Sequence, residues 1–316
     1  MRGPGRLTTG ACTRSLLMTL IRPDEFGHPM RLLPAKKSYR FGPIFLLLIL
    51  ALEFPSVFAS QAAKKVGGNP PSQADQRSLS IREDFHLKLR LSSDVNAPAS
   101  TKVAAKLLGN DFELALFQHQ VEIQGNRFDV RYKLELPSAA AKLSGIPYIA
   151  RHGQGLITAQ GLQGQKMTEQ RGPKGDSYEV RLEADSKTVS LLKNQKKFKE
   201  DVVGGLYTDL TSLPYFWFGK PVKVGRVRLD VMDTKKIYQE TFVGRLTNAR
   251  FQGQVIKAVQ FDKVKRNAED AELSIMVRES DGFPLRVDLG LSAKYGVTAL
   301  MFPKTIPPAT PNFNNR

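Results

Sequence analysis

The sequence predicts a mainly β protein, built on one large curved antiparallel sheet or on a half-open or closed β-barrel, with few short helices. Three observations predict this fold. Apolar and polar residues alternate with a period of two through much of residues 81–303, turn residues separate the alternating segments, and helical periodicity is weak. Strands with one apolar face must share a buried interior, so a sandwich, a closed barrel and a strongly curved sheet all stay open at this stage.

The first 80 residues do not read as part of the β domain. Residues 30–59 have the three parts of a secretory signal peptide: a basic stretch at 31–40, an apolar run at 45–52 and small or aliphatic residues at 57–59. The apolar run is far shorter than the roughly 20 residues that cross a bilayer, which favours a cleaved signal over a membrane anchor or a buried helix. We interpret residues 1–29 as a mis-assigned or disordered extension, with Met30 as an alternative start to Met1, and residues 60–80 as a flexible leader.

Charge and cysteine content narrow the function classes. The chain has 47 Lys and Arg against 30 Asp and Glu, a net charge of +17; removing residues 1–59 takes away eight basic and three acidic residues and leaves +12. The only cysteine, Cys12, lies in the removed segment, so the mature protein is predicted to have no disulfide and no thiolate-bound metal. In an exported protein this basic excess favours anionic lipid headgroups or envelope polymers over nucleic acid.

The β domain is predicted over residues 81–303. Its clearest alternating segments are 85–91, 128–134, 227–231, 273–277 and 285–289. Turns are predicted at 125–126, 173–176, 233–234 and 281–282, where Gly, Asn, Asp or Pro stand between alternating segments. Short helices are predicted at 97–108, 138–144 and 191–203, and residues 304–316, rich in Pro and Asn, as a loose tail.

Two short motifs resemble catalytic ones, and both are interpreted as structural. The segment Arg151–Gly155 resembles a glycine-rich oxyanion turn, but no Gly-x-Ser-x-Gly elbow accompanies it, so we predict a turn between strands. Ser190 and Lys193 have Ser-x-x-Lys spacing without the partner motifs, and Lys193 begins a basic run to Lys199, which predicts a solvated face.

No catalytic, cofactor-binding or metal-ligating residue is predicted. His86, His119 and His152 are too far apart along the chain for a histidine metal motif. The densest aromatic cluster, Tyr215–Phe218, holds the only tryptophan; it is either the lining of an apolar site or part of the core, and we favour the core.

Several segments, in order, resemble an exported bacterial family named Domain of Unknown Function 3108. They are 143–146, 155–162, 179–182, 209–213 and 281–287, within a region of similarity over roughly residues 110–302. At position 278 this chain has Arg, where many relatives carry an aromatic residue nearby. The resemblance implies an exported β-rich envelope protein with no established activity. By a looser analogy it also implies a half-open barrel of the kind that shelters acyl chains in periplasmic carriers.

These observations predict an exported, non-enzymatic periplasmic protein of a Gram-negative cell envelope. We expect it to bind a lipid or other amphiphilic envelope component, or an anionic polymer, in a curved sheet, without a cofactor. Two alternatives stay open. One is an envelope hydrolase or transferase acting on an anionic glycan with two converging carboxylates; the other is an assembly partner that binds another protein through a sheet edge. The oligomeric state and the ligand are left open by the sequence.

Overall fold

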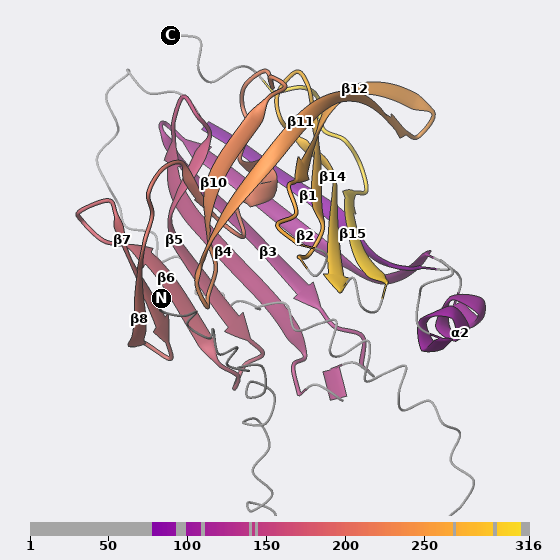
Figure 1. Cartoon of the computed structure of the whole chain (residues 1–316), viewed down its shortest axis with the longest axis horizontal. Helices are drawn as coiled ribbons and strands as arrows, with labels where there is room; N and C mark the ends of the chain where they lie inside the picture. The colour runs from indigo at the N-terminus through magenta and orange to yellow at the C-terminus, as the bar shows by residue number, and fades with distance from the viewer. Residues whose placement is uncertain are drawn as a thin grey trace, which may run out of the picture. The chain divides into compact units, whose positions relative to one another are not determined.

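The computed structural model of the protein describes residues 78–92, 99–108, 111–138, 141–142, 145–267, 270–292 and 296–310. The predicted extension, signal peptide and most of the leader therefore lie outside the described residues, as do residues 311–316 of the predicted tail. One sheet of 15 strands makes up most of the described part (Figure 1). The named helices of this part are the α-helix α2 (Ala99–Leu108) and the 3-10 helix η2 (Leu213–Tyr215). The predicted mainly β fold is confirmed, and its form is a single curved sheet.

The strands have the following bounds in chain order: β1 (Ser78–Leu91), β2 (Asp111–Gln124), β3 (Arg127–Glu135), β4 (Tyr148–Ile157), β5 (Leu162–Arg171), β6 (Ser177–Leu182), β7 (Thr188–Lys193), β8 (Lys196–Val202), β9 (Tyr207–Asp209), β10 (Arg226–Met232), β11 (Ile237–Phe251), β12 (Gln254–Lys263), β13 (Leu273–Arg278), β14 (Pro284–Ser292) and β15 (Val297–Pro303).

The chain lays down the sheet as two meanders that meet at its middle. The first runs outward from β1 to the edge strand β8, and the second begins at the opposite edge with β9 and returns to β15, which pairs with β1. All neighbours are antiparallel except β9 and β10, which are parallel. Most neighbouring strands are therefore consecutive in the chain and form hairpins, as the predicted turn segments require.

The short link between the two edge strands explains why the sheet curves. Laid flat, 15 strands about 4.8 Å apart would place the two edges roughly 65 Å from each other. Yet β8 ends at Val202 and β9 begins at Tyr207, and so few residues reach no further than about 20 Å. The sheet must therefore curl until its edges approach, although β8 and β9 do not pair with each other and the sheet stays open.

The predicted alternation corresponds to one buried and one exposed face. In β1, Phe85, Leu87, Leu89 and Leu91 are buried, whereas the residues between them are half-buried or exposed. Burying a side chain of this kind stabilises the fold by about 1.5–3 kcal/mol. The predicted turns at 125–126, 173–176, 233–234 and 281–282 join successive strands as expected, and α2 falls within the predicted helix at 97–108. Residues 138–144 are only partly described.

The aromatic segment Tyr215–Phe218 is part of the core, as we favoured. All four side chains are buried, and the Trp217 ring stacks on Phe261 with 3.8 Å between ring centroids. The segment is η2 with the turn that follows, rather than a strand, and its carbonyl at Phe216 accepts a hydrogen bond from the backbone N–H of Leu162. It therefore contacts the start of β5 and packs against β12.

Three expectations about local structure are wrong. Residues 191–203 form a hairpin of β7 and β8 instead of a helix, with Asn194 and Gln195 at positive φ in the turn. The segment Arg151–Gly155 lies inside β4 instead of in a turn. Residues 304–310 are held rather than loose, because the guanidinium of Arg278 donates hydrogen bonds to the carbonyls of Pro307 and Pro308 at 2.7 and 3.2 Å.

Candidate functional site

An apolar cavity of about 130 Å³ lies between the two halves of the curved sheet. The strands β1 to β4 supply one wall, β13 to β15 supply the other, and the segment after β9 contributes Leu210, Leu213 and Pro214. The lining residues are Leu87, Leu89, Leu114, Phe117, His119, Tyr132, Leu134, Ile149, Arg151, Leu210, Leu213, Pro214, Leu273, Ile275, Val287, Leu289, Ala299 and Met301. An apolar cavity with few polar groups is the usual form of a small-molecule site.

The three polar lining residues stand in one row across neighbouring strands, and Glu169 extends this row beyond the lining. His119 of β2 lies opposite Tyr132 of β3, Tyr132 lies opposite Arg151 of β4, and Arg151 lies opposite Glu169 of β5. We call these four residues the polar row. Directly opposite residues of antiparallel strands have Cβ atoms about 5 Å apart on one face of the sheet. The register therefore brings together side chains that are 50 residues apart in sequence.

His119 is a neutral histidine inside the core. Burial lowers its pKa to about 3, its ring stacks on Tyr132 with centroids 4.7 Å apart, and its Nδ1 is 3.1 Å from the hydroxyl of Tyr215. Its other ring nitrogen, Nε2, is buried and has no hydrogen-bond partner in the described part of the chain. Because leaving a buried polar atom unpaired costs about 1–3 kcal/mol, this nitrogen is a candidate ligand contact in the cavity lining.

Arg151 is a buried cation that interacts with three carboxyl groups. Its Nη2 is 3.7 Å from Oε2 of Glu169, and electrostatic attraction to Arg151 also acts on Asp209 and Asp233. We call these four residues the buried charge cluster. Burial alone would lower the pKa of Arg151, but Tyr132, Glu169 and Asp233 raise it, so the guanidinium stays charged.

The carboxyl groups of the cluster bind protons more readily than usual. Burial raises the pKa of Glu169 to about 7 against the attraction of Arg151 and Arg171, and burial also raises the pKa values of Asp209 and Asp233. Near neutral pH Glu169 is therefore only partly ionised, which reduces the negative charge around Arg151. A further anion beside Arg151 would meet these carboxyl groups.

Two glycines in the sheet make room for Asp209. A Cβ on Gly153 of β4 would lie 2.6 Å from Oδ1 of Asp209, and a Cβ on Gly164 of β5 would also overlap this carboxyl group. Asp209 in turn accepts hydrogen bonds from the backbone N–H groups of Thr211 and Ser212, both at 2.9 Å. This turn directs the chain into η2, so the glycines of the Arg151–Gly155 segment serve close packing instead of an oxyanion hole.

The converging acids do not form a glycosidase-like cleft. Glu169, Asp209 and Asp233 are all buried, and none of them lines the cavity. Two catalytic carboxylates must both reach the sugar that lies between them. This cluster thus gives the glycan-hydrolase alternative no accessible carboxyl pair.

The other motifs do not assemble into sites. Ser190 and Lys193 are three residues apart in β7, so they face opposite sides of the strand, and Lys193 pairs with Asp176 at 2.7 Å. His152 contacts Asp129 at 2.6 Å and His86 contacts Glu113 at 3.1 Å, both away from His119. Among the described residues, no group of His, Cys, Asp and Glu side chains is arranged to hold a metal ion.

The sequence did not reveal the polar row or the buried charge cluster. Arg151 and Asp209 stood in segments that drew notice for other reasons, while Glu169 and Asp233 gave no signal. Their meeting depends on the register of four strands and on the entry of the segment at 209–212 into the sheet interior. The only sign of these residues in the sequence is that polar residues stand at positions of alternating strands where apolar residues are expected.

The comparisons with known proteins add little to this chemistry. No family model and no curated protein matches the sequence. Among solved structures, the chain is similar to a beta-barrel-like protein of domain of unknown function DUF1849 from Brucella abortus. The TM-score is 0.34 at 9% identity, over 71% of this chain and 96% of that one. In the described residues, no helix has the length and apolar character of a bilayer-spanning segment.

Proposed function

We propose that this protein is an exported, non-enzymatic protein of the bacterial cell envelope that binds the hydrocarbon part of an amphiphile inside its curved sheet. The observation that carries the proposal is the apolar cavity, whose polar lining residues are limited to His119, Tyr132 and Arg151. The signal-peptide pattern at residues 30–59 and the basic excess support an envelope setting. The resemblance to the Domain of Unknown Function 3108 family supports the same setting.

The size of the cavity limits what it holds. A dry cavity of about 150 Å³ accommodates benzene, so a cavity of about 130 Å³ takes a group of about six carbons. The expected ligand is thus a short chain or one end of a longer chain. Accommodating more of a long chain would require the walls to move apart.

The polar lining favours an uncharged polar group on the ligand. Arg151 already faces Glu169, Asp209 and Asp233, so a carboxylate or phosphate beside it would have to compete with these carboxyl groups for the guanidinium. Nε2 of His119 is buried without a partner, and the imidazole is neutral. An ester, an amide or a hydroxyl group supplies the single hydrogen bond that this nitrogen lacks.

A binding experiment tests this proposal. Isothermal titration calorimetry measures the affinity of the protein for alcohols and methyl esters of four to twelve carbons and for the matching carboxylates. We expect affinity to rise about fourfold for each added CH2, since each buried CH2 contributes about 0.8 kcal/mol, and to level off once the cavity is full. Carboxylates should bind at least tenfold more weakly than the methyl esters.

Two matched variants distinguish the cavity from the surface. Ala299→Phe adds a ring inside the cavity, whereas Leu246→Phe adds a ring on β11 at a side chain that is 64% exposed and outside the cavity. Ala299→Phe should abolish binding of the alcohols and methyl esters, and Leu246→Phe should leave it unchanged. Fluorescence of Trp217, the only tryptophan, verifies that both variants fold. Equal binding by all three proteins, or affinity independent of chain length, would contradict the proposal.

A further inference from the structure

A second site lies at the middle of the sheet, where β1 lacks a neighbour along half of its length. β1 pairs with β2 from Ser78 to Arg90, but with β15 only from Phe85 to Leu91. After Lys304, whose backbone N–H donates to the carbonyl of Asp84 at 2.7 Å, the chain leaves the edge of β1. The edge from Ser78 to Glu83, about 20 Å of strand, thus faces no other strand among the described residues.

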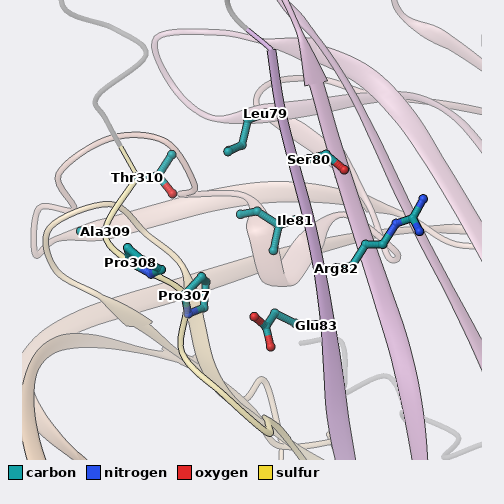
Figure 2. Close-up of a pocket in the computed structure, with 9 residues that line it drawn as sticks. All are labelled: Leu79, Ser80, Ile81, Arg82, Glu83, Pro307, Pro308, Ala309 and Thr310. Atoms are coloured by element: carbon teal, nitrogen blue, oxygen red, sulfur yellow. The ribbon is translucent and has the colours of Figure 1, made fainter.

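A groove of about 400 Å³ separates this free edge from the departing chain (Figure 2). Leu79 to Glu83 form one wall, and Pro307 to Thr310 form the other. We call it the edge groove. Its outer wall is fixed, because Arg278 binds the carbonyls of Pro307 and Pro308 and is itself held by two hydrogen bonds to Asp281, at 2.7 and 2.6 Å. The backbone N–H of Thr310 also donates to Asp281 at 2.7 Å.

The backbone of β1 presents hydrogen-bonding groups to the edge groove. In an antiparallel ladder, alternate residues direct both N–H and C=O to the same side. The bond from Lys304 shows that Asp84 points away from β2, so Arg82 and Ser80 point the same way, into the groove. They offer two donors and two acceptors spaced for an added strand.

We propose that the edge groove binds an extended segment of another polypeptide, which adds to β1 as a strand. The side chains of Leu79 and Ile81 project toward the proline wall, whereas Arg82 projects to the opposite side (Figure 2). Arg82 is exposed and has no ion pair among the described residues. The segment that fits therefore alternates aliphatic residues, which lie beside Leu79 and Ile81, with polar residues that include an acid beside Arg82.

A second copy of this chain fits the edge groove less well than a single strand. Pairing β1 with β1 of another copy would bring that copy's β2 and its residues 307–310 into the space that Pro307 to Thr310 already occupy. A lone extended segment has no neighbouring strand and enters between the two walls. This site is separate from the apolar cavity, with which it shares no lining residue.

The test measures binding of a synthetic strand peptide to the full chain as exported. The probe is a fluorescein-labelled eight-residue peptide that alternates valine with threonine and glutamate, followed by anisotropy. Ser80→Pro removes a donor that faces the groove, on the side of β1 where proline is tolerated, and Ser80→Ala keeps it. We expect Ser80→Pro to weaken binding at least tenfold, Ser80→Ala to change it less than twofold, and a probe N-methylated at alternate residues to bind at least tenfold more weakly than the parent peptide.

Three outcomes would overturn the proposal. They are equal binding by both Ser80 variants, no binding of a panel of such peptides up to millimolar concentration, and a dimer in analytical ultracentrifugation that Ser80→Pro dissociates. The last outcome would assign the edge to a second copy of this chain. Urea unfolding, followed by Trp217 fluorescence, verifies that Ser80→Pro retains its fold.

Discussion

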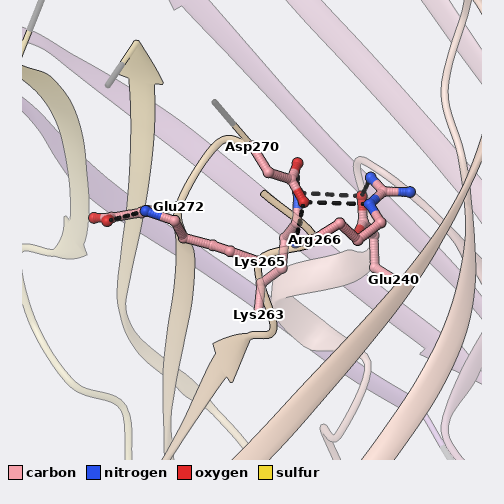
Figure 3. A network of polar contacts seen from close by, with 6 residues as sticks. All are labelled: Glu240, Lys263, Lys265, Arg266, Asp270 and Glu272. Atoms are coloured by element: carbon pink, nitrogen blue, oxygen red, sulfur yellow. Dashed lines mark hydrogen bonds and ion pairs between the residues drawn. The ribbon is translucent and has the colours of Figure 1, made fainter. Parts of the chain in front are cut away.

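Two clusters of charged side chains in this protein differ in how completely they are paired. The surface ion network joins Glu240, Lys263, Arg266 and Asp270 beside β11 and β12, with the separate pair Lys265 and Glu272 nearby (Figure 3). Lys263 contacts Asp270 at 2.8 Å and Glu240 at 3.2 Å, both within hydrogen-bonding distance.

The buried charge cluster is paired less well. Arg151 reaches Glu169 only at 3.7 Å, which is too long for a hydrogen bond, and Nε of Arg151 is buried without a hydrogen-bond partner in the described residues. Both clusters include nearly buried charges, and Arg151 of the buried charge cluster lines the apolar cavity. A well-paired network is sufficiently explained by structure, whereas the incomplete pairing beside the apolar cavity agrees with the ligand site that we propose.

The largest expected effect comes from removing the cation of the buried charge cluster. Arg151→Met removes the one guanidinium that attracts Glu169, Asp209 and Asp233 together, although Glu169 keeps Arg171 at 3.2 Å. Removing one partner of a buried ion pair costs about 3–5 kcal/mol. Urea unfolding at pH 7, followed by Trp217 fluorescence, measures the free energy of unfolding. A loss below about 1 kcal/mol would contradict the assignment of Arg151 as the neutralising group.

Next in size is the pH dependence that Glu169 and His119 contribute with opposite signs. The pKa of Glu169 is raised to about 7 in the folded state, so its contribution is complete below the unfolded value near 4.5 and is lost as pH rises through 7. The pKa of His119 is lowered to about 3, so its contribution is complete above the unfolded value near 6.5 and is lost as pH falls toward 3.

Two variants separate these contributions. The stability difference between wild type and Glu169→Gln should shrink by about 3 kcal/mol from pH 4.5 to pH 8. The difference between wild type and His119→Gln should instead grow between pH 4 and pH 7. Unfolding in urea across this pH series checks both, and slopes of the same sign in the two variants would be inconsistent with burial as the cause.

A smaller effect is expected in the surface ion network. In Lys263→Met, Arg266 still contacts Glu240 at 3.2 Å and Asp270 at 3.3 Å, so neither acid loses its last cation. We expect a loss of about 1–2 kcal/mol, clearly less than for Arg151→Met. The same urea series gives the comparison, and a Lys263→Met effect larger than that of Arg151→Met would reverse our ranking of the two clusters.

The smallest effect is expected at an exposed pair. Arg90 and Asp111 form a two-bond contact at 2.8 Å, but both side chains are at least 40% exposed. Arg90→Ala should cost less than about 1 kcal/mol because solvent screens such pairs. A cost near that of Lys263→Met would show that solvent exposure does not weaken this ion pair.

Local sequence patterns predicted most strands and turns. Features that depend on the pairing of distant strands could not be predicted from these patterns. The alternation at 85–91 and the turn at 125–126 were readable because each depends on adjacent residues. Residues 191–203 resembled a helix because Leu, Lys and Gln favour helices, yet pairing of β7 with β6 overrode that preference. The tail at 304–310 depends on Arg278, a partner about 30 residues away, and the polar row depends on the register of four strands.

We have proposed that the interior of the sheet holds the hydrocarbon part of an amphiphile. Native mass spectrometry of the protein, purified from the periplasm of a Gram-negative host that expresses the full chain, tests it most directly. We predict an adduct of lipid or short-chain amphiphile mass that organic extraction removes and that Ala299→Phe does not retain. A clean apoprotein mass in wild type, or the same adduct in Ala299→Phe, would contradict the claim.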